Sequence, residues 1–285
     1  MGNVSKKIAI IVCYSGKLPW YFHYFTHSCA YNPGVDFLII TDDDSYKRLL
    51  PKNVRLVYKT LSDISKIAAR KLGFPVSLDR GYKLCDFKPV YGLLFSEMLS
   101  GYTFWGHGDI DVIYGDIRAF LTDDLLDSYD LISVRPDWIT GCFLLFRNTP
   151  FMNSLFVESK DYRMVLTNDK YLNFDEAGFG QDAFSEGKTY EEVETGIESM
   201  MHVVKKMEKA GRLRAYFDLH IIEGTPGKLK WQQGKLTYKG MYEALLYHMI
   251  FFKKNYSRNS RDRELPDTFT ISPTRIYHRH KRKSI

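Results

Sequence analysis

The sequence has few cysteines, and their spacing suits neither a metal site nor a disulfide framework. Cys13, Cys29, Cys85 and Cys142 are the 4 cysteines among 285 residues, and no two of them form a Cys-x-x-Cys pair. Widely spaced cysteines of this kind are typical of buried, reduced thiols. We therefore expect the protein to reside in a reducing compartment, the cytoplasm.

The chain also lacks a long apolar run. Ile8 to Cys13 is only of strand length, and no run approaches the ~18 residues that a membrane-spanning helix needs. The start of the chain, Met1 to Lys7, lacks the basic and then apolar layout of a signal peptide. We therefore expect neither a membrane span nor a cleaved leader.

No fixed-period repeat, long low-complexity tract or linker rich in proline, glycine and serine divides the sequence. Its 45% hydrophobic and 26% charged residues are ordinary for a globular protein that can bury a sizeable core. These features predict one domain with a C-terminal elaboration rather than two separate domains.

Positive charge is unevenly placed, within a net charge of +6. The C-terminal basic residues are Arg275, His278, Arg279, His280, Lys281, Arg282 and Lys283, and those upstream are Lys253, Lys254, Arg258, Arg261 and Arg263. Two interpretations stay open: a solvated tail, or one drawn to anionic lipid head groups at ~1 kcal/mol per basic residue. We expect no nucleic acid partner, because no recognition motif accompanies the charge.

The first half of the chain alternates between apolar runs and helical patterns. The predicted strands are 7–14, 35–41, 54–58, 131–134 and 142–146, and the predicted helices are 20–31, 62–72, 86–99 and 151–161. Strands that alternate with helices predict an α/β fold with a mostly parallel central sheet and helices on both faces.

The second half becomes irregular after about residue 160 and predicts an α+β elaboration. Residues 219–222 and 229–238 look like short antiparallel strands, the second with a turn at Gln233-Gly234. Residues 242–250 fit a strand or a helix. We expect this half to cover the open face of the sheet.

The most informative stretch is 104–114, Phe-Trp-Gly-His-Gly-Asp-Ile-Asp-Val-Ile-Tyr. In an extended chain Asp109 and Asp111 would point to the same side, with Ile110 turned into the core. Two converging carboxylates would be costly without a counter-cation and suit Mg²⁺ or Mn²⁺. Gly106 and Gly108 would leave room for a ligand. The alternative is an ordinary polar strand end or turn.

The strand–helix–strand opening, the acidic residues 42–44 at the end of the second predicted strand, and the Asp109-x-Asp111 pair together resemble the GT-A class of nucleotide-sugar glycosyltransferases. The segments 82–89, 104–116 and 140–143 look more narrowly like uncharacterised bacterial proteins associated with surface-polysaccharide synthesis. The resemblance spans most of residues 7–255 and implies a GT-A-like, Rossmann-like fold. Residues 1–255 would form one catalytic domain, with a nucleotide-binding half (1–115) and an acceptor-side half (116–255). Residues 256–285 would form a basic C-terminal tail.

The resemblance implies a metal site and a donor site. Asp109 and Asp111 would hold Mn²⁺ or Mg²⁺ on the donor diphosphate, and a late histidine, His248 or else His220, would complete the metal shell. Lys253 or Lys254 would lie near the phosphates. The implied donor-binding residues are Val12, Cys13, Tyr14, Ser15, Thr41, Asp42, Lys83, Asp86, Gly108, Ile110 and Lys253, with Lys88 as a further candidate.

The resemblance also implies an acidic residue on the acceptor side of the site. Asp175, Asp182 and Glu176 are the candidates for the general base of an inverting transferase, with Asp175 first. Such a base contributes ~10²–10⁴-fold to the rate. A retaining enzyme would use a nearby polar group or the donor phosphate instead.

The sequence thus predicts a metal-dependent glycosyltransferase that moves a sugar from a nucleoside diphosphate donor, a UDP-hexose, to a glycan or lipid-linked acceptor. The basic tail would bring it to the inner face of the membrane. A sugar-phosphate nucleotidyltransferase is an alternative, but its Gly-rich, basic phosphate loop is reduced here to Gly16 and Lys17. A non-catalytic carbohydrate-binding protein on the same fold is the other alternative.

Overall fold

A seven-stranded sheet organises the chain, which the computed structural model describes over residues 7–46, 49–256 and 265–278. Its strands, in spatial order, are β3 (Val54–Tyr58), β2 (Val35–Thr41), β1 (Ile8–Tyr14), β4 (Phe104–Gly108), β7 (Phe143–Arg147), β6 (Leu131–Ser133) and β8 (Ala215–Tyr216). Strands β3, β2, β1 and β4 are parallel, and β7 is antiparallel to both of its neighbours. The predicted α/β fold with a mostly parallel sheet is confirmed.

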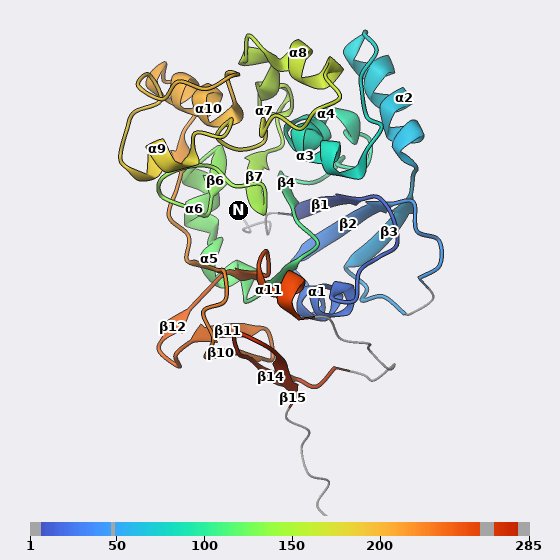
Figure 1. Cartoon of the computed structure of the whole chain (residues 1–285), viewed down its shortest axis with the longest axis vertical. Coiled ribbons are helices and arrows are strands. Elements are labelled where there is room, and N and C mark those ends of the chain that lie inside the picture. The colour runs from blue at the N-terminus through green and yellow to red at the C-terminus, as the bar shows by residue number, and fades with distance from the viewer. Residues whose placement is uncertain (1–6, 47–48, 257–264, 279–285) are drawn as a thin grey trace, which may run out of the picture.

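Helices cover both faces of this sheet (Figure 1). The α-helices are α1 (Phe22–Ala30), α2 (Leu61–Leu72), α3 (Leu84–Phe87), α4 (Tyr91–Leu94), α5 (Ile117–Phe120), α6 (Asp123–Ser128), α7 (Pro150–Asn153), α8 (Tyr162–Thr167), α9 (Gln181–Ser185), α10 (Met200–Lys209) and α11 (Phe252–Asn255). Short 3-10 turns are η1 (Gly81–Lys83), η2 (Lys88–Val90) and η3 (Leu155–Glu158). Among the described residues, no helix combines the length and apolarity needed to cross a bilayer.

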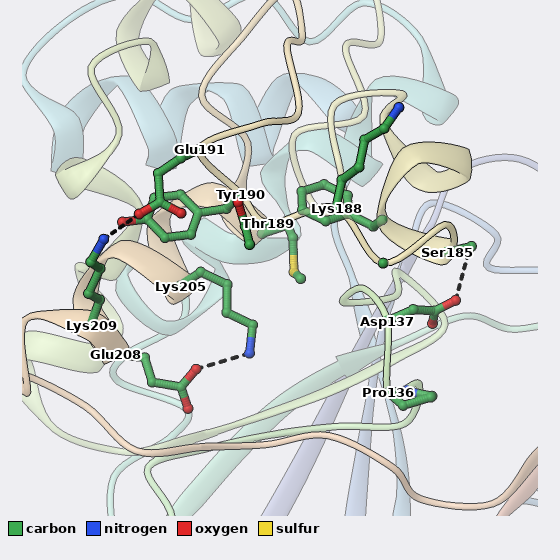
Figure 2. Close-up of a pocket in the computed structure, with 13 residues that line it drawn as sticks. Pro136, Asp137, Ser185, Lys188, Thr189, Tyr190, Glu191, Lys205, Glu208 and Lys209 are labelled. Carbon is green, nitrogen blue, oxygen red and sulfur yellow. Dashed lines mark hydrogen bonds and ion pairs between the residues drawn. The ribbon is translucent and has the colours of Figure 1, made fainter.

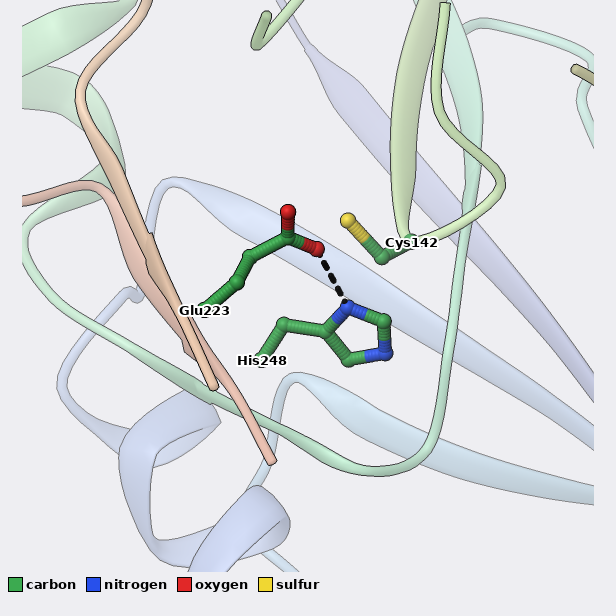
Figure 3. A group of neighbouring side chains, drawn as sticks. All are labelled: Cys142, Glu223 and His248. Carbon is green, nitrogen blue, oxygen red and sulfur yellow. Dashed lines mark hydrogen bonds and ion pairs between the residues drawn. The ribbon is translucent and has the colours of Figure 1, made fainter. Parts of the chain in front are cut away.

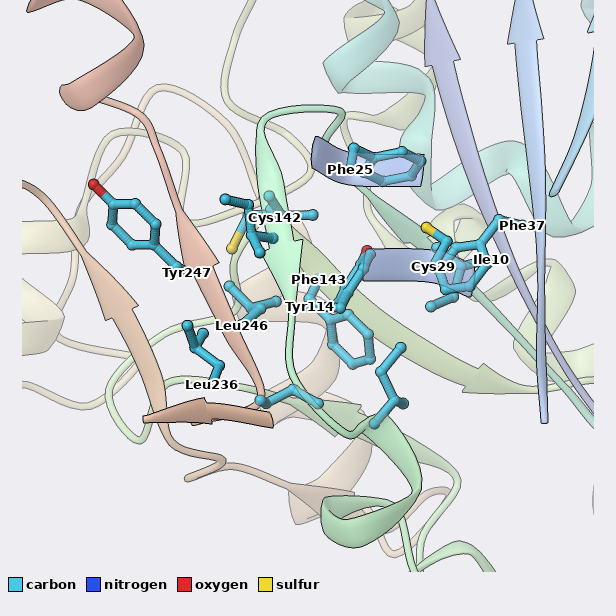
Figure 4. Packing of buried hydrophobic residues seen from close by; sticks show 14 of the residues in the cluster. Ile10, Phe25, Cys29, Phe37, Tyr114, Cys142, Phe143, Leu236, Leu246 and Tyr247 are labelled. Atoms are coloured by element: carbon cyan, nitrogen blue, oxygen red, sulfur yellow. The ribbon is translucent and has the colours of Figure 1, made fainter. Parts of the chain in front are cut away.

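Two apolar cores result from the alternation of side chains along the buried strands. Ile10 of β1 packs in one core with Phe25 of α1 and Phe37 of β2 (Figure 4), while Ile11 packs in the other with Ile64 of α2. Burial on both faces explains why β1 and β2 are continuous apolar runs. The sheet edge that carries the strand ends is thereby held between two packed layers.

Two smaller sheets lie on the same side of the main sheet as α1 (Figure 1). The three-stranded one has the order β5 (Val112–Tyr114), β13 (Leu246–His248), β9 (Ile221–Glu223); the five-stranded one has the order β12 (Tyr242–Glu243), β11 (Lys235–Tyr238), β10 (Leu229–Gln232), β14 (Thr268–Ile271), β15 (Ile276–His278). The predicted hairpin at Gln233-Gly234 is confirmed, with both turn residues at positive φ. Residues 242–250, for which strand and helix were both open, supply the strands β12 and β13.

The structure corrects two details of the predicted elements. The strand predicted at 219–222 is β9, and it pairs in parallel with β13 rather than antiparallel, because a long excursion through β10–β12 separates the two. The helix predicted over 86–99 is broken into α3, η2 and α4. Pro89 lacks an N–H for the helix, and Gly92 lies where a Cβ would come within 2.5 Å of the Trp105 ring.

The C-terminal segment also differs from expectation. Part of residues 256–285, assigned from sequence to a basic tail, is folded: β14 pairs with β10 and β15 with β14. Phe269 of β14 is fully buried and stacks on Trp231 with ring centroids 5.0 Å apart. Most of the basic residues named for the tail (Arg258, Arg261, Arg263, Arg279, His280, Lys281, Arg282 and Lys283) lie outside the described residues.

Replacing Phe269 by alanine tests whether β14 is part of the folded core. We expect Phe269→Ala to lower the free energy of unfolding by about 3–5 kcal/mol, the usual loss for a buried aromatic ring. Thr270→Ala, at the next and half-buried position of β14, is the matched control. Urea unfolding curves measure both variants, and equal small losses would contradict the packing of this segment.

Candidate metal centre and active-site cleft

A cleft opens at the carboxyl ends of β1 and β4, where the strand order of the sheet changes direction. It has a volume of about 540 Å³, and its lining includes Ser15 after β1, Asp109 and Asp111 after β4, Asp175 and His248. Between β1 and β4 lies the topological switch point, because β2 and β3 continue on one side of β1 and β4 on the other. Ligands of open α/β sheets bind at this place.

The two aspartates converge, but not in the extended conformation that the sequence suggested. Asp109 to Asp111 form the turn that joins β4 to β5. The turn, rather than a period of two residues, brings both carboxylates into the cleft, and Ile110 is buried as expected.

Strand register brings His248 to the aspartates. His248 of β13 pairs with Val112 of β5, the residue after Asp111, and with Glu223 of β9 on its other side. Its Nε2 lies 3.5 Å from Asp111 Oδ2 and 3.9 Å from Asp109 Oδ2. Two carboxylates and an imidazole thus face one point, with one donor atom from each within 4.8 Å of the others.

Glu223 orients the imidazole. His248 Nδ1 lies 2.8 Å from Glu223 Oε1 (Figure 3). A carboxylate can only accept a hydrogen bond, and although burial raises the pKa of Glu223, hydrogen bonding to His248 and the charges of His248 and Arg135 lower it below its usual range. Nδ1 therefore carries the proton of this bond, and Nε2 is directed to Asp109 and Asp111.

The donor set fits a divalent cation. Burial alone would raise the pKa of Asp111, but hydrogen bonding to His248 and the charges of His248 and Lys253 hold it below its usual range. Burial alone would lower the pKa of His248, which Cys142 and the hydrogen bonds to Asp111 and Glu223 instead raise. A divalent ion at Nε2 would take the place of the proton there. Ligands about 2.1 Å from one ion and at right angles are about 3 Å apart, and His248 Nε2 lies 3.5 and 3.9 Å from the two carboxylates. Asp109, Asp111 and His248 would hold the ion.

A second group, Cys142 with Glu223 and His248, also brings three donor types together (Figure 3). Burial raises the pKa of the Cys142 thiol, while the charge of His248 and hydrogen bonding to it lower that pKa. Glu223 is engaged with the imidazole. This group therefore supports His248 rather than forming a second centre.

Two lysines meet the aspartates from opposite sides. Lys253 Nζ lies 2.5 Å from Asp111 Oδ2, and Lys88 Nζ lies 2.7 Å from Asp109 Oδ1. Lys88 is buried and also lies 3.3 Å from Asp175 Oδ2 and 3.0 Å from the carbonyl of Gly141. Burial would lower the pKa of Lys88, but the charge of Asp109 outweighs it and raises that pKa well above its usual value.

The structure separates the three acids predicted for the acceptor side. Asp175 is buried at the cleft, and burial raises its pKa well above the usual value against the charge of Lys88. Glu176 also lines the cleft, but it accepts hydrogen bonds from the Gly141 N–H at 2.6 Å, Asn173 and Gln181. Asp182 is exposed on α9 and is not part of the cleft lining.

The residues predicted to bind the donor fall into two groups: some line the cleft, and others are buried behind it. Cys13, Tyr14, Ser15, Ile110 and Lys253 line the cleft. Val12, Thr41 and Gly108 are buried behind it. Asp42 accepts hydrogen bonds from Ser15 Oγ at 2.8 Å and from the Gly16 N–H at 2.6 Å, and so shapes the loop after β1. His220, the competing histidine, is exposed and lines a different pocket.

Lys83 and Asp86, expected to touch the donor, form a buried ion pair of 2.8 Å outside the cleft lining. Lys83 also donates to the carbonyls of Val165 and Lys170, and Asp86 accepts from the N–H groups of Leu172 and Phe174. Together they fix the segment that leads to Asp175. Both side chains thus have a positioning role, because they hold the acceptor side of the cleft in place.

Sequence reasoning missed Glu223 and the side chains behind it. Arg135 Nη1 lies 3.2 Å from Glu223 Oε2, and its other nitrogens bind Asp137 at 2.7 and 2.9 Å. Ser185 Oγ donates to Asp137 at 2.6 Å. The sequence held one signal, the Arg135-x-Asp137 pair after a strand, but its link to His248 arises only from the pairing of β9 with β13.

A larger cavity, of about 670 Å³, lies between α9 and α10 (Figure 2). Its charged side chains pair with one another: Lys205 lies 3.0 Å from Glu208, and Lys209 lies 2.5 Å from Glu191. None of the residues in the aspartate–histidine cluster lines it. Size alone would favour this cavity, but Asp109, Asp111 and His248 come together in the cleft at β1 and β4.

The chain matches a family whose function is unknown. The family of unknown function DUF6625 matches residues 10–280. No curated protein sequence matches the chain. Among solved structures, the galactosyltransferase LgtC in complex with donor and acceptor sugar analogs is similar with a TM-score of 0.35, at 11% sequence identity over 75% of each chain. A likeness this distant carries no argument about activity.

Removing Glu223 tests its orienting role. We expect Glu223→Ala to weaken Mn²⁺ binding 10–100-fold, the usual cost of losing a partner that orients a ligand. Electron paramagnetic resonance of free Mn²⁺ measures the dissociation constant. Glu243→Ala, on β12 and 3.8 Å from Lys235, is the control and should bind as wild type. Equal dissociation constants for both variants would contradict the role of Glu223.

Proposed function

For this chain, which belongs to the DUF6625 family of unknown function, we propose the activity of a metal-dependent glycosyltransferase acting on a nucleoside diphosphate sugar. The observation that carries the proposal is the meeting of Asp109, Asp111 and His248 in a cleft at the switch point of a parallel sheet. Nucleotides bind at such points, and Mg²⁺ is usually held by one or two carboxylates together with substrate phosphates.

The donor would lie along the carboxyl ends of β1 and β4. Tyr14 and Ser15 would contact the nucleoside, and Lys253 and Lys254, both in the cleft lining, would contact the diphosphate. A divalent ion held by Asp109, Asp111 and His248 would offset the charge that builds on the departing diphosphate. With phosphate present, Lys253 can exchange Asp111 for a phosphate oxygen, because its side chain is about one third exposed (30%).

Asp175 is the candidate general base for the acceptor hydroxyl. It lies in the cleft next to Lys88, which connects it to Asp109. Its raised pKa makes the ionised carboxylate a stronger base than an ordinary aspartate. The acceptor proton would pass to Asp175 while the acceptor oxygen bonds to the anomeric carbon and the diphosphate leaves, which inverts that carbon.

The rival activity, nucleotidyl transfer, needs backbone N–H groups free to cradle a triphosphate after β1. Here the N–H of Gly16 donates to Asp42, and that of Leu18 donates to Asp43 Oδ2 at 2.7 Å. Acidic side chains already occupy this loop and would repel phosphates. The loop therefore favours glycosyl transfer over nucleotidyl transfer.

The finer parts of the proposal concern substrate and place. A UDP-hexose is the proposed donor, and a glycan or lipid-linked saccharide of a bacterial surface polysaccharide is the proposed acceptor. We propose a cytoplasmic protein that meets the inner face of the membrane through its basic C-terminal residues. These residues follow the cleft residues Lys253 and Lys254 in sequence, which would bring a lipid-linked acceptor near the cleft.

The variant Asp111→Asn tests the metal and donor site. In wild-type protein, UDP with Mn²⁺ should raise the melting temperature more than either alone, since a ligand at about 100 times its Kd adds about 2.7 kcal/mol. Asp111→Asn should fold but lose this joint shift and lose donor hydrolysis. Asp124→Asn, at an exposed position of α6, should behave as wild type. A joint shift that survives in Asp111→Asn would contradict the proposal, and selective stabilisation by a nucleoside triphosphate would favour the rival.

The variant Asp175→Asn tests the base. We expect transfer to fall ~10²–10⁴-fold, while the shift with UDP and Mn²⁺ is kept. Since a base works in its ionised form, wild-type transfer should decline as the pH falls through the raised pKa of Asp175, and the variant should lack that limb. Asp182→Asn, which changes the exposed acid outside the cleft, is the control. Loss of transfer in Asp182→Asn and not in Asp175→Asn would reverse the assignment.

A further inference from the structure

We propose that Phe179, backed by Tyr171 and Tyr82, forms an aromatic platform that binds a sugar ring of the acceptor. The inference rests on the proposed function and adds the chemical class of the acceptor at its binding point. All three rings line the cleft that holds Asp109 and Asp111.

The rings form a connected group at the mouth of the cleft. Tyr82 and Tyr171 meet edge to face with centroids 4.8 Å apart, and Tyr171 meets Phe179 in the same way at 5.8 Å. Phe179 is 65% exposed and Tyr82 is 69% exposed. Exposed aromatic rings beside a cleft that contains polar groups mark a binding surface.

The backbone at Phe179 is strained, and because the Phe179 side chain is exposed, its burial does not compensate for that strain. Its φ is 68°, a left-handed conformation that is a genuine outlier for a bulky residue. Gly178 and Gly180 flank it, and its N–H donates to Asn173 Oδ1 at 2.9 Å, which holds the strained turn. Asn173 is itself buried with a φ of 58°. Strain of this kind clusters at binding sites and active sites, and here its effect is to hold an aromatic ring in solvent.

The polar neighbours suit a carbohydrate rather than an apolar ligand. Glu176 and Gln181 line the cleft beside the rings, and Gln181 Nε2 lies 3.0 Å from Glu176 Oε2. A sugar ring presents C–H groups on one face, which pack on an aromatic ring, and hydroxyls at its rim, which need donors and acceptors. The loop from Tyr171 to Gln181 supplies both kinds of contact.

The platform is connected to the proposed base. The Tyr171 hydroxyl lies 3.2 Å from Asp175 Oδ1 and accepts a hydrogen bond from Asn173 at 2.7 Å. A sugar that rests on these rings would therefore have its hydroxyls close to Asp175. The proposed nucleoside contacts are Tyr14 and Ser15, and Gly81, which precedes Tyr82, lies close to them, since a Cβ there would come within 3.2 Å of Ser15 Cβ. The contact of Tyr171 with Asp175, rather than the place of Tyr82, assigns the platform to the acceptor.

Saturation-transfer NMR on the full chain tests the proposal, with UDP and Mg²⁺ present and methyl glycosides of glucose, galactose, mannose, N-acetylglucosamine and rhamnose as probes. Wild-type protein should give signals from ring C–H protons of at least one glycoside. Phe179→Ala should reduce that signal at least tenfold, and Phe179→Trp should keep it. Tyr277→Ala removes an exposed ring on β15, outside the cleft lining, and should keep it too.

The outcomes separate this proposal from the proposed function. No signal from any glycoside with wild-type protein, or an equal signal with Phe179→Ala, overturns the platform. Loss of the thermal shift with UDP and Mn²⁺ in Phe179→Ala also overturns it, because the ring would then bind the nucleobase. Absence of that shift in wild-type protein would instead contradict the proposed function.

The strain can be tested without any ligand. Asparagine tolerates the left-handed conformation, so Phe179→Asn should melt no lower than wild type although a ring contact with Tyr171 is lost. A clearly lower melting temperature would mean that the ring stabilises the fold, and the platform would be overturned.

Discussion

The concentration of negative charge at one sheet edge is the constraint on which the site depends. Asp109, Asp111 and Asp175 all lie in one cleft, and uncompensated carboxylates in a half-buried place are costly. The ammonium groups of Lys88 and Lys253 compensate them, and the imidazole of His248 lies beside Asp109 and Asp111. Because Lys88, His248 and Lys253 come from segments far apart in sequence, this charge arrangement depends on the fold that brings both halves of the chain to one cleft.

Much of the fold could be predicted from local sequence, because buried parallel strands leave a direct mark. The continuous apolar runs of β1 and β2 arise from burial on both faces. The turn Gln233-Gly234 predicts a hairpin, because both of its positions have positive φ. The helix over 86–99 could not be placed correctly, since Pro89 lacks an N–H for a continuous helix and the segment divides into α3, η2 and α4. The parallel pairing of β9 with β13 depends on a long connection that no local pattern reveals.

The candidate site likewise contains some residues that local sequence reveals and others that it does not. Asp109 and Asp111 could be identified from their spacing and from their place after an apolar run, although a turn and not an extended strand brings them together. The resemblance predicts His248 as a ligand, and strand register gives it the expected neighbours. Glu223 had no local signal, and Lys83 with Asp86 fitted a ligand-binding motif while holding the segment before Asp175. Phe179 is ordinary in sequence and becomes notable through its backbone angle.

Pulsed electron paramagnetic resonance of Mn²⁺ bound to the protein together with UDP tests the central claim most directly. The account predicts one directly coordinated ¹⁴N, from His248, and ³¹P couplings from the diphosphate on the same ion. The ¹⁴N coupling should vanish in His248→Ala and persist in a variant of the exposed His220. Bound Mn²⁺ without a nitrogen ligand, or with nitrogen but without phosphorus coupling, would contradict a metal ion held by Asp109, Asp111 and His248 on a nucleoside diphosphate.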